Sequence, residues 1–404
     1  MAPSAGPSTA SPPSCRRPAA AASCGRSSRH RGTGLFSTAI HRKGTQVKRA
    51  PLRRSWYAVP GRQHKLRQPV VSVGNLSMGG RGKTPLVSYI ARLLLDAGER
   101  PAILSRGYGR RRVEDGVVVV SDGHHILADV DRSGDEPLML ARAVPGAGVF
   151  VCDQRVLAGA LAERRFGATV HVLDDGFQHL TLSRDVDVVV VSPEDLRDRA
   201  VPFGRLREPV SALASADAVL LDGDGLPNVG RPFRAGGLAG LKPRPTFDLP
   251  ASVRQFSLRR SLGTVRALEP DRPWPQDAAL RLGSGQGPVV AAAGIARPER
   301  FAAALRDAGW QVAREVAFAD HHRYTAVDVA RLASDVTATG AIGVVTTEKD
   351  AGRLLPWRPF PVRIATVSLE ISVTPGGFGD QSALLHPADH FRTWLLDRLR
   401  EARA

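Results

Sequence analysis

A glycine-rich segment near residue 80 constrains the fold of this 404-residue chain more than any other feature. It follows a β-branched run at 69–73 and leads into a pattern of helical spacing over 84–97. A strand, a glycine-rich turn and a helix in this order form a phosphate-binding loop, because glycines let backbone N–H groups turn inward and the helix N-terminus attracts anions. The predicted nucleotide-binding loop consists of Ser77, Met78, Gly79, Gly80, Arg81, Gly82, Lys83 and Thr84.

Two side chains of this loop have predicted contacts with the nucleotide. We expect Lys83 to reach the β- and γ-phosphates and the Thr84 hydroxyl to bind Mg²⁺, although Ser77 stands where the usual pattern has glycine. Such a loop also needs an acidic residue at the end of another strand. The apolar run that ends in Asp174 and Asp175 supplies one, since ligand sites of α/β sheets form at the carboxyl ends of strands. These features predict a Mg²⁺–nucleotide site and leave the acceptor open.

Short apolar runs alternate with segments of helical spacing along the body of the chain. This alternation indicates a mostly parallel sheet covered on both faces. The predicted fold class is α/β, a P-loop NTPase-like sheet with a second, smaller α/β domain. Strands are expected at 69–73, 101–104, 117–120, 148–151, 169–173, 186–191, 218–221, 288–293, 311–316 and 342–346, and helices at 84–97, 137–143, 155–166, 298–308 and 326–337.

Composition divides the chain into five segments. A Pro-, Ser- and Ala-rich basic extension at 1–34 is expected to be disordered. It is compatible with a transit peptide, a disordered tail or an early start codon. The lead-in 35–66 mixes basic with aromatic residues, and it suits either an anionic membrane surface or plain solvent. The P-loop domain is expected at 67–242, an inter-domain connection rich in Pro, Gly and Arg at 243–287, and the smaller domain at 288–404.

The formal net charge of +17 is concentrated at the N-terminus. Residues 1–70 hold 14 of the 56 Lys and Arg and no acidic residue, which leaves 42 basic against 39 acidic residues in the body. A net of +3 argues against a basic groove for nucleic acid in the folded part. No apolar run approaches the roughly 18–20 residues that a membrane-spanning helix needs.

Short motifs follow one another in a characteristic order along the chain. They are VGNL at 73–76, KTP at 83–85, SRGYGR at 105–110, GDEP at 134–137, LDDGFQH at 173–179, LREP at 206–209, GIARP at 294–298, DHH at 320–322 and TEKD at 347–350. In this order they closely resemble the motifs of the tetraacyldisaccharide 4'-kinase family, which are lipid A pathway kinases of Gram-negative bacteria. The resemblance runs from about residue 50 to the C-terminus.

The resemblance implies an ATP- and Mg²⁺-dependent kinase that makes lipid IVA. The γ-phosphate would pass to the 4'-hydroxyl of a tetraacylated glucosamine disaccharide 1-phosphate, at an active site between a P-loop domain and a smaller α/β domain. Family members usually begin with an apolar anchoring helix, whereas the lead-in here is basic. We therefore expect peripheral attachment to the cytoplasmic face of the bacterial inner membrane, where each basic residue near the headgroups adds about 1 kcal/mol.

The resemblance also implies roles for individual residues. Asp135 takes the place of the base that accepts the hydroxyl proton, and His321 pairs with it when the two domains close on substrate. Asp174 and Asp175 map to the metal ligands or their supports. The same matching places five further residues in the lining of the site, namely Glu136, Gln178, His179, Arg207 and Glu208. The role of the TEKD motif stays open.

Two other functions fit parts of the sequence. A P-loop phosphotransferase or GTPase with another acceptor would share the phosphate loop and Asp174 but would not need Asp135 paired with His321. An ATP-driven nucleic-acid-binding protein would use the basic N-terminus, but it would also need a basic, aromatic-lined groove in the body.

Overall fold

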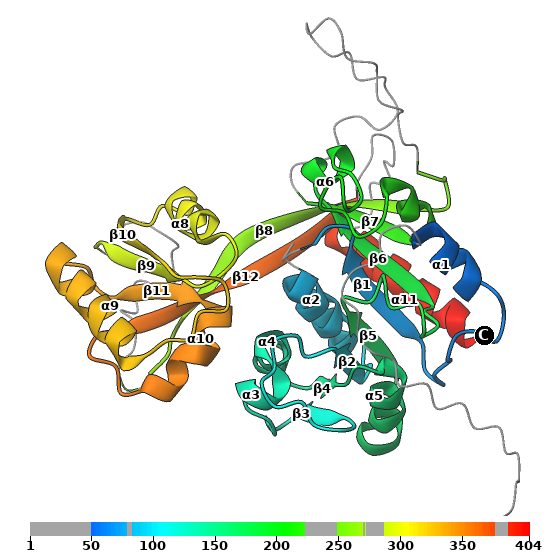
Figure 1. The fold of residues 1–404 in the computed structure, drawn as a ribbon, viewed down its shortest axis with the longest axis horizontal. Helices are drawn as coiled ribbons and strands as arrows, with labels where there is room; N and C mark the ends of the chain where they lie inside the picture. Colours follow the sequence, from blue (N-terminus) through cyan, green and yellow to red (C-terminus); the bar gives the residue numbers. More distant parts are fainter. Residues whose placement is uncertain (1–49, 79–82, 223–248, 270, 272–286, 376–386) are drawn as a thin grey trace, which may run out of the picture. The chain divides into compact units, whose positions relative to one another are not determined.

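The computed structural model describes residues 50–78, 83–222, 249–269, 271, 287–375 and 387–404, all within the compact unit Gln46–Ala404. The extension 1–34 and residues 79–82 of the phosphate loop lie outside the described residues. The described strands form one twelve-stranded sheet in the order β10-β9-β11-β12-β8-β7-β6-β1-β5-β2-β4-β3 (Figure 1).

The strands are β1 (Val70–Asn75), β2 (Pro101–Ser105), β3 (Val118–Asp122), β4 (Gly148–Val151), β5 (Val170–Asp174), β6 (Val186–Val191), β7 (Ala218–Asp222), β8 (Arg254–Ala267), β9 (Val289–Ala293), β10 (Val312–Ala317), β11 (Val344–Thr347) and β12 (Ile364–Pro375). The helices include α1 (Ala50–Tyr57), α2 (Lys83–Asp96), α3 (Val130–Ser133), α4 (Asp135–Ala143), α5 (Arg155–Leu161), α6 (Pro193–Arg197), α8 (Pro298–Asp307), α9 (Ala326–Thr339), α10 (Glu348–Leu354) and α11 (Pro387–Arg403), with shorter turns at η1 (Ala162–Phe166), η2 (Val210–Ser215) and η3 (Leu355–Trp357).

The first lobe, residues 50–222, is built on β1 to β7. These strands pair in parallel except for β3 at the edge, which runs antiparallel to β4. Every residue of β1 and of β6 is buried, as expected for parallel strands covered on both faces. Apolar side chains of α2 and α4 cover one face of the sheet, and those of α5 cover the other. The carboxyl ends of β1 and β5 therefore meet at one edge of a rigid sheet.

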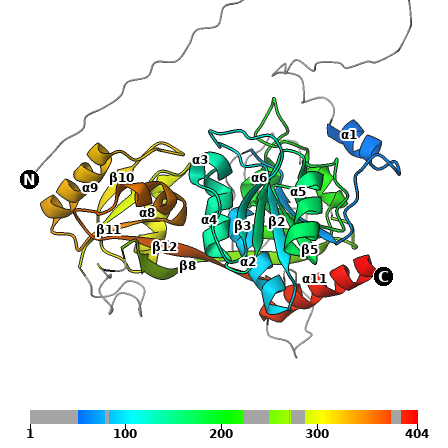
Figure 2. The same cartoon turned by 90° about the horizontal axis from the view of Figure 1, so that it is seen from below.

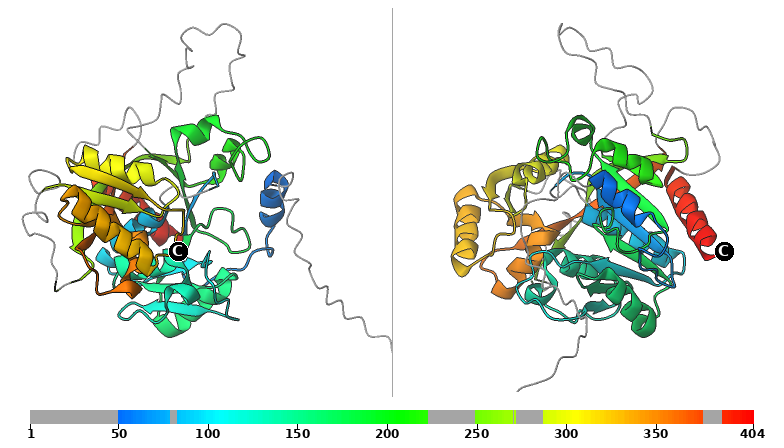
Figure 3. Two further views of the ribbon diagram at one scale, coloured as in Figure 1. Left: turned by 60° about the vertical axis from the view of Figure 1, so that its left-hand side comes forward. Right: turned by 45° about the vertical axis from the view of Figure 1, so that its right-hand side comes forward.

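The second lobe, residues 287–363, is built on the parallel strands β9, β10 and β11. Helix α8 packs on one face of these strands, and α9 and α10 pack on the other (Figure 3). The ends of α9 follow from its sequence. The Thr325 side chain accepts a hydrogen bond from the Asp328 N–H as an N-terminal cap, and Gly340 ends the helix with a φ of 63°.

The lobes are joined by β8 and β12, which run antiparallel as a long two-stranded ribbon (Figure 1). The chain then returns to the first lobe, where Phe391, Leu395 and Leu399 of α11 pack into the core beside α2 (Figure 2). The described part of the predicted connection 243–287 thus includes a long strand. The last helix of the segment 288–404 lies against the first lobe.

The structure confirms the predicted α/β class, and each predicted strand and helix lies within about two residues of an observed one. The sequence patterns did not predict the strands β8 and β12 or the helices α1, α3, α6, α10 and α11. None of the described helices combines the length and the apolar character needed to span a bilayer.

Candidate active site

The phosphate loop leaves the sheet at the end of β1, and α2 begins at Lys83. Strand β1 lies so close to the loop after β5 that a Cβ added to Gly74 would come within 2.4 Å of the Phe177 Cβ. Of the remaining loop residues, Ser77 is buried and Met78 is 57% exposed. Thr84 is buried in the first turn of α2.

A network of polar side chains lies beside the start of α2. The Lys83 Nζ is 2.6 Å from Asp175 Oδ1 and donates to Asn75 Oδ1 at 3.0 Å. Arg207 donates to both carboxylate oxygens of Asp175 at 2.8 Å and to Asn75 Oδ1 at 2.6 Å. The Asn75 Nδ2 in turn donates to the Ser77 hydroxyl at 3.1 Å. The structure thus links the predicted residues Ser77, Lys83, Asp175 and Arg207 through Asn75, for which the sequence motifs predicted no role.

The two carboxylates at the end of β5 have opposite electrostatic environments. Burial raises the pKa of Asp174 to about 7, with help from the charges of Glu136 and Asp175, against the opposing charge of Lys83 and a hydrogen bond from Ser105. Burial also raises the pKa of the Asp175 carboxyl, but the bonds from Arg207 and the charge of Lys83 outweigh it and hold that pKa well below its usual range. Asp175 is therefore held in its ionised form by its partners, whereas the pKa of Asp174 lies near neutral pH.

Gln178 and Glu208, two of the predicted lining residues, lie close to Asn75. Gln178 Nε2 donates to the Asn75 carbonyl at 3.0 Å and lies 3.4 Å from Glu208 Oε2. Glu208 forms an ion pair of 2.5 Å with Arg54 of α1, so it also ties that helix to the first lobe. The hydrogen bond described for His179 runs to Thr181, at 3.1 Å.

Asp135 is the first residue of α4, and its position depends on the glycine before it. Gly134 has a φ of 86°, and a Cβ there would meet the Tyr108 carbonyl at 2.8 Å. The Asp135 Oδ2 lies 2.7 Å from Nδ1 of His321, which comes from the second lobe and has a φ of 61°. The structure therefore brings the two residues of the predicted catalytic pair into direct contact across the lobes.

Arg353 of α10, which lies outside the predicted motifs, also contacts Asp135. Its guanidinium donates through Nε to Asp135 Oδ1 at 2.9 Å and through Nη2 to Oδ2 at 2.6 Å. Burial raises the pKa of the Asp135 carboxyl, but the bonds from Arg353 and His321 outweigh it, so that the pKa lies below its ordinary value. Arg353 follows Lys349 by four residues and so shares its helical face, which is the signal that could have identified it.

Residues of the TEKD motif, 347–350, contact His321 and Arg353. Lys349 Nζ lies 3.2 Å from Nε2 of His321. Because an ammonium group can only donate, Lys349 is the donor to Nε2, and Nδ1 is the ring nitrogen that faces Asp135. Asp350 is fully buried, accepts from the Gly294 N–H at 3.0 Å and lies 3.4 Å from Arg353 Nη1.

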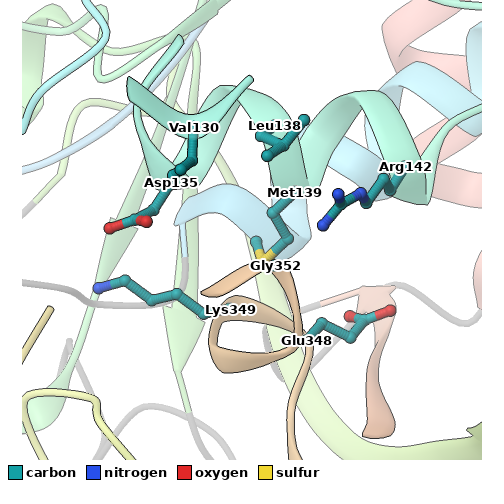
Figure 4. Close-up of a pocket in the computed structure, with 8 residues that line it drawn as sticks. All are labelled: Val130, Asp135, Leu138, Met139, Arg142, Glu348, Lys349 and Gly352. Atoms are coloured by element: carbon teal, nitrogen blue, oxygen red, sulfur yellow. The ribbon is translucent and has the colours of Figure 1, made fainter. Parts of the chain in front are cut away.

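Glu348 completes the motif. Burial raises the pKa of its carboxyl. Together with Asp135, Lys349, Met139 and Arg142 it lines a small cavity between α4 and α10 (Figure 4).

The residues beside the phosphate loop fit a divalent cation. A carboxylate whose pKa is raised by burial and by like charges is one that a bound cation would return to its ionised form. In the described part of the chain, no three His, Cys, Asp or Glu side chains form a ready-made metal site. In nucleotide sites Mg²⁺ is usually held by one or two carboxylates together with the phosphates.

Comparison with known proteins identifies relatives that are similar to this chain over most of its length. The family model described as tetraacyldisaccharide-1-P 4'-kinase matches residues 36–384. A tetraacyldisaccharide 4'-kinase from Geobacter metallireducens is 40% identical over 73% of this chain and 81% of its own. The enzyme of the same name from Syntrophus aciditrophicus is 38% identical, over 76% of this chain and 80% of its own.

A solved structure has the same fold. It is the "apo" form of LpxK from Aquifex aeolicus, described as in complex with ATP. It superposes with a TM-score of 0.63 and 27% identity, covering 88% of this chain and 96% of the other.

Proposed function

We propose that this chain, which belongs to the tetraacyldisaccharide-1-P 4'-kinase family, transfers the γ-phosphate of ATP to the 4'-hydroxyl of a tetraacylated disaccharide 1-phosphate to give lipid IVA. The observation that carries the proposal is the contact of Asp135 with His321 in the same unit as the phosphate loop. Family membership confirms the resemblance found in the sequence motifs. It favours the lipid acceptor over the two other interpretations, a different acceptor and a nucleic-acid partner.

Lys83, Thr84 and Asp174 are the residues that would hold the nucleotide and its metal. Lys83 would exchange its contact with Asp175 for the phosphate oxygens, while Arg207 keeps the Asp175 carboxylate paired. The Thr84 hydroxyl and the Asp174 carboxylate would hold Mg²⁺, with Asp175 as their support. When bound, Mg²⁺ neutralises charge on the phosphates during transfer.

Asp135 is the proposed base. A sugar hydroxyl is a weak nucleophile, so a kinase positions it and provides a carboxylate for its proton. The Nδ1 atom of His321 and the fork of Arg353 fix both oxygens of Asp135 in place, which leaves the remaining lone pairs for the acceptor. Glu136 and Gln178 are proposed to line the same site, with His179 and Glu208 at its edge.

We propose peripheral attachment to the cytoplasmic face of the inner membrane through the basic lead-in. Within its described part, Trp56 of α1 is 51% exposed, and Arg62 stacks on its ring at 4.4 Å. An exposed aromatic ring next to a cation suits the headgroup region of an anionic bilayer. The proposed domains are the P-loop lobe with α11, the second lobe, and the ribbon of β8 and β12 between them.

The test is product analysis with purified protein, ATP, Mg²⁺ and the tetraacyl disaccharide 1-phosphate in detergent. We expect a product heavier by one phosphoryl group, placed at the 4'-position by tandem mass spectrometry, and none with Asp135→Asn. Arg392→Gln on α11 is the matched control and should retain activity. Hydrolysis of ATP without transfer, or a phosphate at another hydroxyl, would refute the proposal.

A further inference from the structure

Arg54 of the lead-in helix α1 directs its guanidinium into the first lobe, where the side chain is 15% exposed. Its Nε and Nη2 atoms donate to the two carboxylate oxygens of Glu208, at 3.0 and 2.5 Å. Nη2 also donates to the Phe177 carbonyl at 3.0 Å, and the guanidinium carbon lies 4.0 Å from the centre of the Phe177 ring. One arginine therefore holds two separate segments, the loop after β5 and the loop before η2.

Both segments lie against the entry of the phosphate loop. The Arg207 N–H donates to the Leu76 carbonyl at 2.6 Å, and the Met78 N–H donates to the Arg205 carbonyl at 2.8 Å. The two backbones thus pair in an antiparallel manner directly before the glycines of the loop. On the other segment, the Phe177 side chain is fully buried and shares an apolar cluster with Leu76. The backbone that leads into the loop is therefore fixed by the same two segments that Arg54 holds.

Glu208 depends on Arg54 for the balance of its charge. Glu208 is only 5% exposed. Among the described side chains, its other hydrogen-bonding partner is Gln178, a neutral amide, at 3.4 Å. A buried carboxylate that loses its cationic partner is strongly destabilised. Loss of Arg54 would therefore favour movement of Glu208 toward solvent, and with it movement of the backbone that pairs with the entry of the phosphate loop.

Arg54 acts on the nucleotide site through these two segments. In the described part of the chain, its hydrogen bonds run to Glu208 and Phe177. The connection to Lys83, which is proposed to contact the phosphates, runs through Arg207. Arg207 is the chain neighbour of Glu208, and it donates to the same carboxylate that Lys83 contacts. This placement suits a residue that orients the loop rather than one that binds the phosphates.

We propose that Arg54 is a positioning residue of the nucleotide site, which holds the segments around Phe177 and Glu208 together and so fixes the entry of the phosphate loop for ATP. The lead-in helix is then a part of the nucleotide site as well as the proposed membrane contact. The inference rests on the proposed function, because it takes the loop to bind ATP. A loop that is fixed in advance loses less conformational freedom on binding, so the loss of Arg54 should weaken ATP binding.

The test is calorimetric titration of the purified full-length chain with ATP and Mg²⁺ in the absence of acceptor. Arg54→Gln is expected to raise the Kd for ATP roughly 10-fold, the effect of losing about one hydrogen bond to a charged group. In the transfer assay KM for ATP should rise by a similar factor, with KM for the acceptor nearly unchanged. Arg54→Lys keeps the charge and should restore part of the affinity. Arg67→Gln removes an exposed arginine next to the lead-in, and as the matched control it should bind ATP as wild type does.

A double variant separates positioning from stability. Arg54→Gln leaves Glu208 buried without its cation and should lower the melting temperature, whereas Arg54→Gln combined with Glu208→Gln removes both charges and should regain stability. The affinity of the double variant for ATP should stay low, because the contacts of Arg54 are still absent. If the double variant binds ATP as tightly as wild type does, the inference is refuted. It is also refuted if Arg54→Gln folds and binds ATP normally.

The titrations also distinguish this inference from the proposed function. If wild type binds ATP more tightly than Arg54→Gln but transfers no phosphate to the lipid acceptor, the proposed function fails and the positioning role of Arg54 stands. If wild type transfers phosphate and Arg54→Gln has an unchanged KM for ATP, the proposed function stands and the positioning role fails. If wild type binds no ATP, both fail.

Discussion

Replacing Arg353 tests whether Asp135 acts as the base. Arg353 is 7% exposed and provides two of the three hydrogen bonds that Asp135 receives from described side chains. In Arg353→Met, burial would act on Asp135 with only His321 to oppose it, so the pKa of that carboxyl should rise. A base must be ionised to accept a proton. The acidic limb of the pH profile of kcat/KM should therefore move to higher pH.

The magnitude follows from the contacts that are lost. A hydrogen bond to a charged group contributes roughly 1.5–3 kcal/mol, and one pKa unit corresponds to about 1.4 kcal/mol. Because part of the loss is recovered by water and by His321, we expect the limb to move by on the order of one pH unit. The pKa of Asp135 lies below its unfolded value, so its contribution to stability is present above that unfolded value and is lost as pH falls through the folded one. Arg353→Met should weaken this dependence of the melting temperature on pH.

The assay is kcat/KM for the lipid acceptor at saturating ATP, over a range that begins at about pH 3, because an unperturbed aspartate titrates near pH 3.9 and the pKa of Asp135 lies below that. Removing one partner of a buried ion pair lowers the stability of the fold by about 3–5 kcal/mol. The melting temperature of each variant is therefore measured together with its activity. Arg353→Lys keeps the positive charge but cannot donate two parallel hydrogen bonds to Asp135, so it should move the acidic limb of the pH profile less than Arg353→Met does. If Arg353→Met folds and loses activity with its acidic limb in the wild-type position, Asp135 is not the group that titrates.

Three further predictions concern the loop, the pair and the N-terminus. Lys83→Ala should abolish transfer without unfolding the protein, because the charge between the phosphates is lost; near-normal turnover would show that the nucleotide binds elsewhere. Asp135→Ala should lower kcat by about 10²–10⁴-fold, and His321→Ala by as much or less. The double variant should be little worse than the worse single one, whereas multiplicative losses would mean independent roles. Deletion of residues 1–34 should leave activity unchanged, and high salt should release the full-length protein from membranes; a need for detergent would contradict peripheral attachment.

The first-lobe strands could be predicted from sequence because they are buried on both faces and therefore read as continuous apolar runs. The ribbon could not be predicted in this way. In β8, buried and exposed positions alternate irregularly over 14 residues, so neither a strand nor a helix period dominates. Helix α11 carries a readable stripe at Phe391, Leu395 and Leu399, but no local pattern tells which lobe this stripe covers.

The residues of the candidate site divide in the same way, into those that a local pattern predicts and those that it does not. Lys83, Asp174 and Asp175 follow from a strand–loop–helix pattern, in which chemistry and position are encoded together. Asn75 belongs to the VGNL motif, which gave it no role, and Arg353 lies outside the motifs; the contacts of both depend on how β1 and α10 approach other elements. Of the side chains that hold Asp175 and Asp135, the motifs included Arg207 and His321, whereas the role of Arg353 became visible only in the structure.

Asp135 joins the two lobes at a point far from their covalent connection. The chain links the lobes through β8 and β12, whereas Asp135 on α4 binds Arg353 and His321 of the second lobe directly. If Asp135 is the base, its carboxylate is held in position by these contacts, and a change at Asp135 should alter both proton transfer and the association of the lobes. Asp135→Asn keeps hydrogen-bonding capacity at this point, and Asp135→Ala does not. A difference in protease resistance between these two equally inactive variants would separate the two roles.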